Sequence, residues 1–214
     1  MLSAAVELAD HLGFEALTMR KLAEELGVGA MSLYYYVPNK DELLDGMVEI
    51  VFAEIEVPAD TADWKAAMRH RANSGRAALA RHRWANGLME SRTRPGPESL
   101  RLHNDVLGVL REAGFSIELA IHANSVLDAY IYGFALQEAS VPFDTPDELA
   151  DVIGEQVRHV EADKDMTAFA EAFPHLAEIV VGHIAHSGFD FGEEFEYGLA
   201  LILDGLEQRL TRDQ

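Results

Sequence analysis

Apolar residues recur every three or four positions along almost the whole chain, and this spacing is the period of an α-helix. No segment alternates apolar and polar residues as a half-buried strand does. The 214 residues are 49% hydrophobic, which is enough apolar material to bury a sizeable core. The sequence therefore predicts an all-α fold.

Several functional classes lack their usual sequence signatures. The chain has no cysteine, which excludes disulfides and thiolate metal sites. No apolar run reaches the roughly 18 residues of a membrane-spanning helix, and the segment Met1 to Leu12 does not have the pattern of a secretion signal. We therefore expect a cytoplasmic protein that makes no membrane contact.

Catalytic and metal-binding motifs are also missing. The sequence holds no glycine-rich phosphate loop and no nucleophile elbow, so we expect no catalytic site and no cofactor. His183 and His186 lie three positions apart, and His70 and His82 flank another expected helix. No carboxylate completes a recognised ligand pattern beside them, so no metal site is predicted.

Glycine, proline and capping residues divide the chain into helices. A first helix is expected to stop at Gly13, and Thr18, Asn39 and Ser116 are expected N-caps of later ones. From residue 58 to residue 61 the composition turns small and polar, which predicts a domain of residues 1–57 and a second of residues 58–214. Beyond that boundary, helices are expected over 64–82, 84–92, 98–112, 117–139, 148–162, 176–186 and 193–210.

The segment from Leu17 to Val37 has the spacing of two short helices that cross closely. Ala23 offers a small side chain at the crossing, and Gly27 can adopt the left-handed conformation that ends the first helix. Val28 and Leu33 are expected to fill the space between the two helices. This spacing is typical of a DNA-binding helix-turn-helix, whose second helix enters the major groove.

The second of these helices, residues 30–36, is too short to bury all of its large side chains. One interpretation packs its three tyrosines against neighbouring helices. The other exposes them, so that their hydroxyls bind phosphates while Met31 and Ser32 contact base edges. Arg20 and Lys40 start the flanking helices, where backbone N–H groups also favour phosphate; plain solvent exposure is the alternative.

The formal net charge of −20 opposes DNA binding, because duplex DNA repels a polyanion. Salt screens distant charges within about 10 Å, however, so the charge near the docking face matters more. Between residues 17 and 40 the charged residues are slightly basic in sum: Arg20, Lys21 and Lys40 against Glu24 and Glu25. This local balance weakens the objection.

The helix-turn-helix segment resembles the DNA-binding domain of the tetracycline-repressor (TetR) family. The resemblance covers residues 18–44 and includes Leu22-Ala23, Leu26-Gly27-Val28, Leu33-Tyr34, Lys40 and Leu43-Leu44. Later segments are similar to the regulatory domain of tetracycline repressors: Thr93-Arg94-Pro95, residues 114–118, residues 195–199 and residues 205–207.

The resemblance implies a three-helix DNA-binding domain and a larger helical domain for ligand binding and dimerisation. It implies a homodimeric repressor on palindromic double-stranded operator DNA, released when a small-molecule effector binds. Residues 116–139 and 193–210 would form a four-helix bundle between subunits. The implied DNA contacts are Arg20, Ala30, Met31, Ser32, Tyr34, Tyr35, Tyr36 and Lys40.

The expected effector is not the tetracycline–magnesium chelate. Family members that bind it carry a histidine three residues before Thr-Arg-Pro, where this chain has Glu90. Other polar ligand positions hold Ala72, Arg76, Val106, Ala129 and Gln137. A flat polycyclic or other amphipathic metabolite is the expected class.

Polar residues on otherwise apolar helices are candidates for holding this effector, because unpaired charge inside a core is costly. Surface charges and internal ion pairs are the alternative for them, and simple core packing is the alternative for Trp84. The candidate ligand-binding residues are Arg76, Trp84, Glu90, Arg94, His103, Asn124, Asp128 and Gln137.

Two other classes of protein stay open. A helical enzyme or carrier would need a nucleophile–base pair, a metal set or a cofactor motif, and none is visible in the sequence. A helical interaction or small-molecule-binding protein that binds no operator would suit the acidic charge. Binding chemistry also does not distinguish repression from activation.

Overall fold

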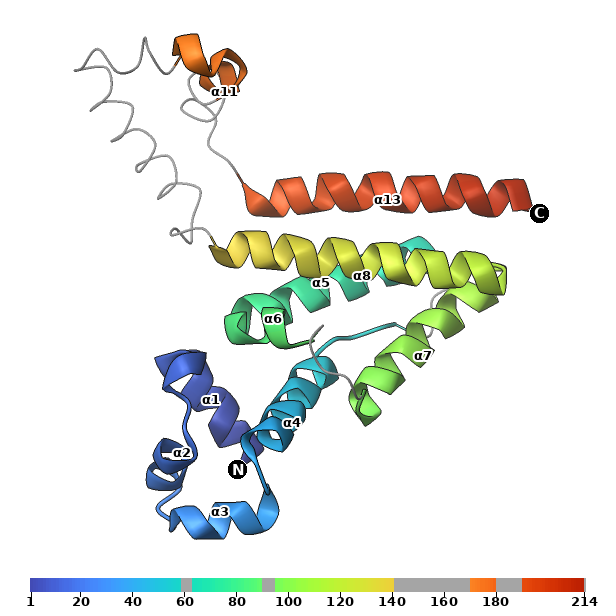
Figure 1. Ribbon diagram of the computed structural model, residues 1–214. Helices are drawn as coiled ribbons and strands as arrows, with labels where there is room; N and C mark the ends of the chain where they lie inside the picture. The colour runs from blue at the N-terminus through green and yellow to red at the C-terminus, as the bar shows by residue number, and fades with distance from the viewer. Residues whose placement is uncertain (59–62, 90–94, 141–169, 180–189, 214) are drawn as a thin grey trace. The chain divides into compact units, whose positions relative to one another are not determined.

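The computed structural model describes residues 1–58, 63–89, 95–140, 170–179 and 190–213 (Figure 1). Within these ranges all regular structure is helical and no strand is present, so the predicted all-α fold is confirmed. The same ranges contain no helix with the length and apolar character needed to cross a membrane. The chain forms two compact units, residues 1–139 with 199–214 and residues 140–198. The proposed boundary after residue 57 stays a prediction.

The first unit begins with four helices, which we call the N-terminal helices. They are α1 (Leu2–Leu12), α2 (Met19–Glu25), α3 (Ala30–Tyr36) and α4 (Lys40–Ala53), with a 3-10 turn at Phe14–Ala16. A single apolar core holds them together, and its buried members include Leu22, Leu33, Leu43 and Met47. These N-terminal helices are the part of the chain predicted to read DNA.

The remaining helices of the first unit follow after residue 62. They are α5 (Trp64–Arg81), α6 (Asn86–Met89), α7 (Pro97–Glu112), α8 (Ile117–Ser140) and most of α13 (Phe191–Asp213), with a 3-10 turn at Arg83–Ala85. The helix expected over 84–92 begins with this tighter turn, and residues 90–92 lie outside the described residues. In the second unit, α11 (Pro174–Ile179) precedes the start of α13. The helix expected over 148–162, and residues 180–186, lie outside the described residues.

Side-chain caps set the starts of several helices. The Thr18 hydroxyl accepts a hydrogen bond from the Lys21 N–H at 3.2 Å, and the Asn39 amide oxygen accepts one from the Glu42 N–H at 2.9 Å. The Ser116 hydroxyl accepts one from the Leu119 N–H at 3.1 Å. Each cap satisfies a backbone donor that has no partner within its helix. The three predicted N-caps are confirmed.

The turn between α2 and α3 depends on Gly27, whose φ of 65° is in the left-handed region. The Val28 N–H donates to the Ala23 carbonyl at 3.0 Å and the Gly27 N–H to the Glu24 carbonyl at 3.2 Å, which is the Schellman pattern of helix ends. The Val28 side chain is 44% exposed, so the prediction that Val28 fills the space between the helices is wrong. Leu33 is buried there as predicted, and Leu26 packs against the core.

Lys65 of α5 forms ion pairs with two acidic residues of α13. The Lys65 ammonium lies 2.8 Å from an Asp204 carboxylate oxygen and 2.6 Å from one of Glu207. The hydrogen bond to Asp204 raises the pKa of Lys65 most, and the hydrogen bond to Glu207 raises it further. Within the first unit, Leu199, Leu203, Leu206 and Leu210 of α13 are buried, while Leu201 stays exposed. Helix α13 thus has one buried face and one face open to solvent.

Candidate functional site

The outward face of α3 carries most of its large side chains. Tyr34, Tyr35 and Tyr36 are 44%, 84% and 71% exposed, and Met31 is 82% exposed. Leu33 is the buried residue that fixes the helix to the core of the N-terminal helices. The structure therefore does not show the alternative in which neighbouring helices cover the three tyrosine rings.

The two flanking basic residues are also accessible, and each already has a weak partner. The Arg20 Nε lies 2.9 Å from a Glu24 carboxylate oxygen, and both side chains are exposed. The hydrogen bond to Glu24, with the attraction between the charges, raises the pKa of Arg20. The Lys40 ammonium lies 5.1 Å from the centre of the Phe14 ring. Exposed pairs of this kind exchange readily for phosphate because water screens them.

The dimensions of α3 suit the major groove of DNA. An α-helix with its side chains is about 10–12 Å across, and the major groove is about 12 Å wide. Ala30 and Ser32 are exposed on this helix beside Met31 and the tyrosines. The α3 surface (Ala30, Met31, Ser32, Tyr34, Tyr35, Tyr36) can therefore present hydroxyl and apolar groups to base edges and phosphates together.

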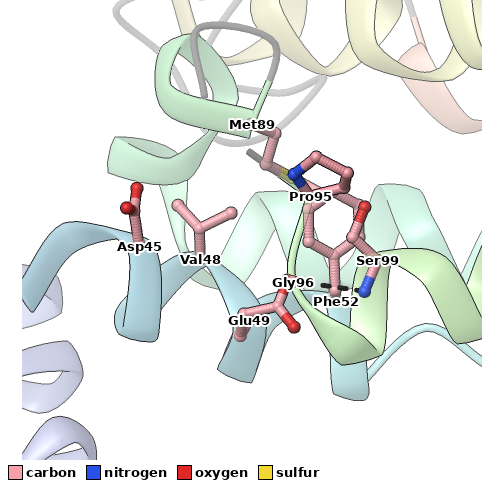
Figure 2. A pocket seen from close by; sticks show the side chains of 8 residues that line it. All are labelled: Asp45, Val48, Glu49, Phe52, Met89, Pro95, Gly96 and Ser99. Atoms are coloured by element: carbon pink, nitrogen blue, oxygen red, sulfur yellow. Dashed lines mark hydrogen bonds between the residues drawn. The ribbon is translucent and has the colours of Figure 1, made fainter. Parts of the chain in front are cut away.

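Helix α7 is capped by a residue of α4. The Glu49 carboxylate accepts hydrogen bonds from the backbone N–H of Glu98 at 2.6 Å and of Ser99 at 3.4 Å. A cavity of about 90 Å³ adjoins this contact (Figure 2). Its lining residues are Asp45, Val48, Glu49, Phe52, Met89, Pro95, Gly96 and Ser99. The cap is a direct polar link between the N-terminal helices and the helices after residue 62.

A second polar link surrounds His82 at the end of α5. Its Nδ1 lies 2.9 Å from a carboxylate oxygen of Asp10 in α1, and its Nε2 lies 3.1 Å from one of Glu54 after α4. The Trp84 indole N–H donates to the same Asp10 oxygen at 2.7 Å. Trp84 also packs against the core of the N-terminal helices. The structure thus places this ligand-binding candidate at the junction with α1.

A partly buried polar cluster lies among α5, α7 and α8. Arg71 is 2% exposed and its Nη2 donates to Asp128. The Asn124 side-chain amide donates to the other oxygen of Asp128 at 2.8 Å. The His103 Nε2 lies 3.8 Å from Asp128, while its Nδ1 lies 2.7 Å from the Ser99 carbonyl. The structure therefore brings three ligand-binding candidates, His103, Asn124 and Asp128, together around Arg71.

The other ligand-binding candidates lie apart from this cluster or outside the described residues. Arg76 forms a two-pronged ion pair with Glu138, with N–O distances of 2.9 and 2.6 Å, and lies over the Phe134 ring. Gln137 is exposed on α8. Glu90 and Arg94 fall in the range 90–94, which is not described.

Sequence reasoning missed Arg71, although a signal for it exists. The inward positions of α5 are Trp64, Ala67, Met68, Arg71, Ala72, Gly75, Ala78 and Leu79. Arg71 is the charged residue on this apolar face, and a charge there needs a partner. Glu49 and Asp10 gave no such signal, because their partners are far away in the sequence.

In the portion of the chain that is described, no group of three or more histidine and carboxylate side chains is arranged to hold a metal ion. His70 pairs with Glu56, with 2.9 Å between Nε2 and the carboxylate oxygen. His183 and His186 lie outside the described residues.

The fold and the site together define a class of protein. A helix-turn-helix whose second helix exposes its large residues is typical of a DNA-binding protein. Comparison with known proteins then identifies the family. The family model described as bacterial regulatory proteins, tetR family, matches residues 1–47. The model described as tetracyclin repressor-like, C-terminal domain, matches residues 57–210.

Curated relatives and solved structures agree with this match. The HTH-type transcriptional repressor DrrR1 of Streptomyces coeruleorubidus is 36% identical, covering 97% of this chain and 76% of its own. The class A tetracycline repressor from transposon 1721 of Escherichia coli is 32% identical, covering 98% and 89%. Apo ActR from Streptomyces coelicolor is similar in structure, with a TM-score of 0.78, 29% identity, and coverage of 100% and 95%.

This chain belongs to the TetR family, as its sequence predicts. It is a DNA-binding transcriptional regulator with a tetracyclin repressor-like C-terminal domain, and the two curated relatives named above are repressors.

Proposed function

We propose that the α3 surface of a homodimer reads successive major grooves of a palindromic operator. The exposure of Tyr35 and Tyr36 beside the buried Leu33 carries this proposal. A side chain that is held outward by a fixed helix is ready to contact DNA without rearrangement. The proposed contacts are Arg20, Ala30, Met31, Ser32, Tyr34, Tyr35, Tyr36 and Lys40. In the complex, Arg20 exchanges Glu24 for a backbone phosphate.

The dimer forms through α8 and α13. Both helices leave large apolar residues exposed: Ile117, Ile121, Val126 and Leu136 on α8, and Tyr197 and Leu201 on α13. Ile117 and Ile121 lie one turn apart, as do Tyr197 and Leu201, and apolar residues exposed side by side on a helix are typical of a protein interface. A four-helix bundle from two subunits would bury them and set the distance between the paired α3 helices.

The effector is a flat, polycyclic small molecule that releases the operator when it binds the helices after residue 57. ActR of Streptomyces coelicolor, at 28% identity and a TM-score of 0.74, has been solved in complex with actinorhodin. Glu90 stands where tetracycline–magnesium binders carry a histidine, so this chain has a different effector.

Residues 1–57 act as the DNA-binding domain and residues 58–214 act as the regulatory domain. The protein is cytoplasmic and has no catalytic activity.

A gel-shift assay with the gene's own upstream region tests this function. We expect a salt-sensitive shift that disappears in Tyr34→Ala and in Arg20→Ala, because both substitutions remove phosphate contacts. Arg101→Ala is the control for Arg20→Ala, because Arg101 pairs with Glu98 and Asp105 on α7, and we expect this variant to retain the shift. The absence of a shift at low salt with any palindromic site would favour the helical interaction protein instead.

A further inference from the structure

The buried guanidinium of Arg71 has more hydrogen-bonding capacity than the protein uses. Its Nη2 is bound to Asp128, but its Nε and Nη1 have no acceptor among the residues that the structure describes. Both nitrogens are shielded from solvent. A charged group in this state is costly, because it has given up water without a full replacement. The arrangement is expected when a ligand supplies the missing acceptor.

Asn124 shows the complementary deficit beside it. Its amide nitrogen donates to Asp128, while its Oδ1 is buried and receives no hydrogen bond from the described part of the chain. Arg71 and Asn124 hold different oxygens of one carboxylate, so they lie side by side across Asp128. The cluster therefore has free donors on Arg71 and a free acceptor on Asn124 a short distance apart.

The charges of Arg71 and Asp128 limit which ligands can supply the missing acceptor. The cation of Arg71 is already balanced by the Asp128 carboxylate. A strongly ionised ligand would leave one charge unbalanced in a buried site, whereas a neutral or weakly acidic oxygen would not.

We propose that Arg71 and Asn124 form the polar end of the effector site and bind a hydroxy-carbonyl edge of a polycyclic molecule. The carbonyl oxygen accepts hydrogen bonds from Arg71, and the neighbouring hydroxyl donates to Asn124 Oδ1. Asp128 fixes the positions of both side chains and does not contact the ligand. This inference rests on the proposed effector response and specifies the chemical class that the response recognises.

Two matched probes test the proposal on the full chain. Alizarin is a planar anthraquinone with one hydroxyl beside a carbonyl and a second hydroxyl next to the first, and anthraquinone has the same ring system without hydroxyls. Thermal shift and fluorescence titration measure the binding of each, because a ligand of the native state raises its melting temperature. We expect the wild-type chain to bind alizarin at least about ten-fold more tightly than anthraquinone, the effect of one good buried hydrogen bond.

Two substitutions separate the contacts. Arg71→Lys keeps a cation for Asp128 but removes the guanidinium donors, so we expect about ten-fold weaker binding of both probes. Asn124→Ala removes only the acceptor, so the preference for alizarin over anthraquinone should disappear. Arg101→Lys is the control: Arg101 pairs with Glu98 and Asp105 on α7, and we expect no change in binding.

Each outcome decides the proposal. Equal binding of the two probes by the wild-type chain, or no binding of either, overturns it. An unchanged alizarin affinity in Arg71→Lys and Asn124→Ala also overturns it and indicates that water fills the site. If Arg71→Lys fails to fold, the wild-type probe comparison and Asn124→Ala still decide. Operator binding is measured separately by gel shift, so a failure of the repressor function is distinguished from a failure of this site.

Discussion

The imidazole of His82 is hydrogen bonded to the carboxylate of Asp10, with 2.9 Å between Nδ1 and the oxygen. On its other side, its Nε2 lies 3.1 Å from Glu54. A neutral imidazole has one N–H, so both carboxylates receive a hydrogen bond at once only from the protonated ring. His82 follows α5 and Asp10 belongs to α1, so this buried contact joins the N-terminal helices to the helices that follow.

Replacement of His82 should weaken both the fold and this link. We expect His82→Ala to lower the free energy of unfolding by about 1–3 kcal/mol, because two partly buried carboxylates lose a partner. His70→Ala is the matched control, since His70 is an exposed histidine that also pairs with a carboxylate. Urea denaturation measures both variants. Equal stability of the two would show that the His82 contacts contribute nothing.

Glu54 should make the free energy of unfolding depend on pH in the acidic range. Burial by itself raises the pKa of Glu54, but hydrogen bonds from Arg81 and His82 outweigh it and hold the pKa below its ordinary value. Such a carboxyl stabilises the fold above its unfolded pKa, about 4.3 for glutamate, and this stability is lost as pH falls through the lower folded value. The free energy of unfolding should therefore fall below about pH 4.3, and less steeply in Glu54→Gln. Urea denaturation across this pH range measures the free energy of unfolding of the wild type, of Glu54→Gln and of the control Glu56→Gln. If this free energy changed with pH equally in all three proteins, Glu54 would have no such effect.

The Glu49 cap of α7 has no room for a side chain at Gly96. A methyl group built at Gly96 overlaps the Glu49 carboxylate, whereas one at Gly108 in the same helix meets open space. We expect Gly96→Ala to cost about 1–3 kcal/mol through displacement of the cap. Gly108→Ala should stabilise the helix by about 0.5–1 kcal/mol. Thermal denaturation compares the two, and a stabilised Gly96→Ala would contradict the description of the cap.

The proposed dimer interface can be broken with a single charge. Leu201 of α13 and Leu100 of α7 are exposed to a similar extent, 59% and 56%. We expect Leu201→Glu to be a monomer in sedimentation velocity experiments, because a carboxylate buried between two subunits has no partner there. Leu100→Glu should remain a dimer. If Leu201→Glu remained a dimer, the dimer interface would lie elsewhere on the chain.

Local features of the sequence predicted the N-terminal helices well. Thr18, Asn39 and Gly27 act on backbone groups within a few residues, so their effects can be read from spacing alone. The resemblance to the TetR family depended on this same stretch. The prediction for Val28 was wrong because an apolar residue next to a turn is not always buried.

Contacts between distant residues could not be predicted in the same way. Arg71 and Asp128 are 57 positions apart, and Asp10 and His82 are 72 apart. Nothing in the local pattern of α5 says which acid faces Arg71, and Trp84 is equally compatible with a ligand wall or with a contact to α1. Tertiary packing decides these pairings, because many acidic residues in this chain could serve each of them.

Operator affinity of Tyr35→Ala tests the DNA-reading role of α3 most directly. Fluorescence anisotropy with an operator duplex from the upstream region measures it, and circular dichroism measures the melting temperature of the same protein. Because Tyr35 is exposed and is a proposed DNA contact, we expect operator binding to weaken by about ten-fold while the melting temperature stays unchanged. Unchanged affinity in Tyr35→Ala, and in the double variant with Tyr36→Ala, would contradict the assignment of α3 as the helix that reads DNA.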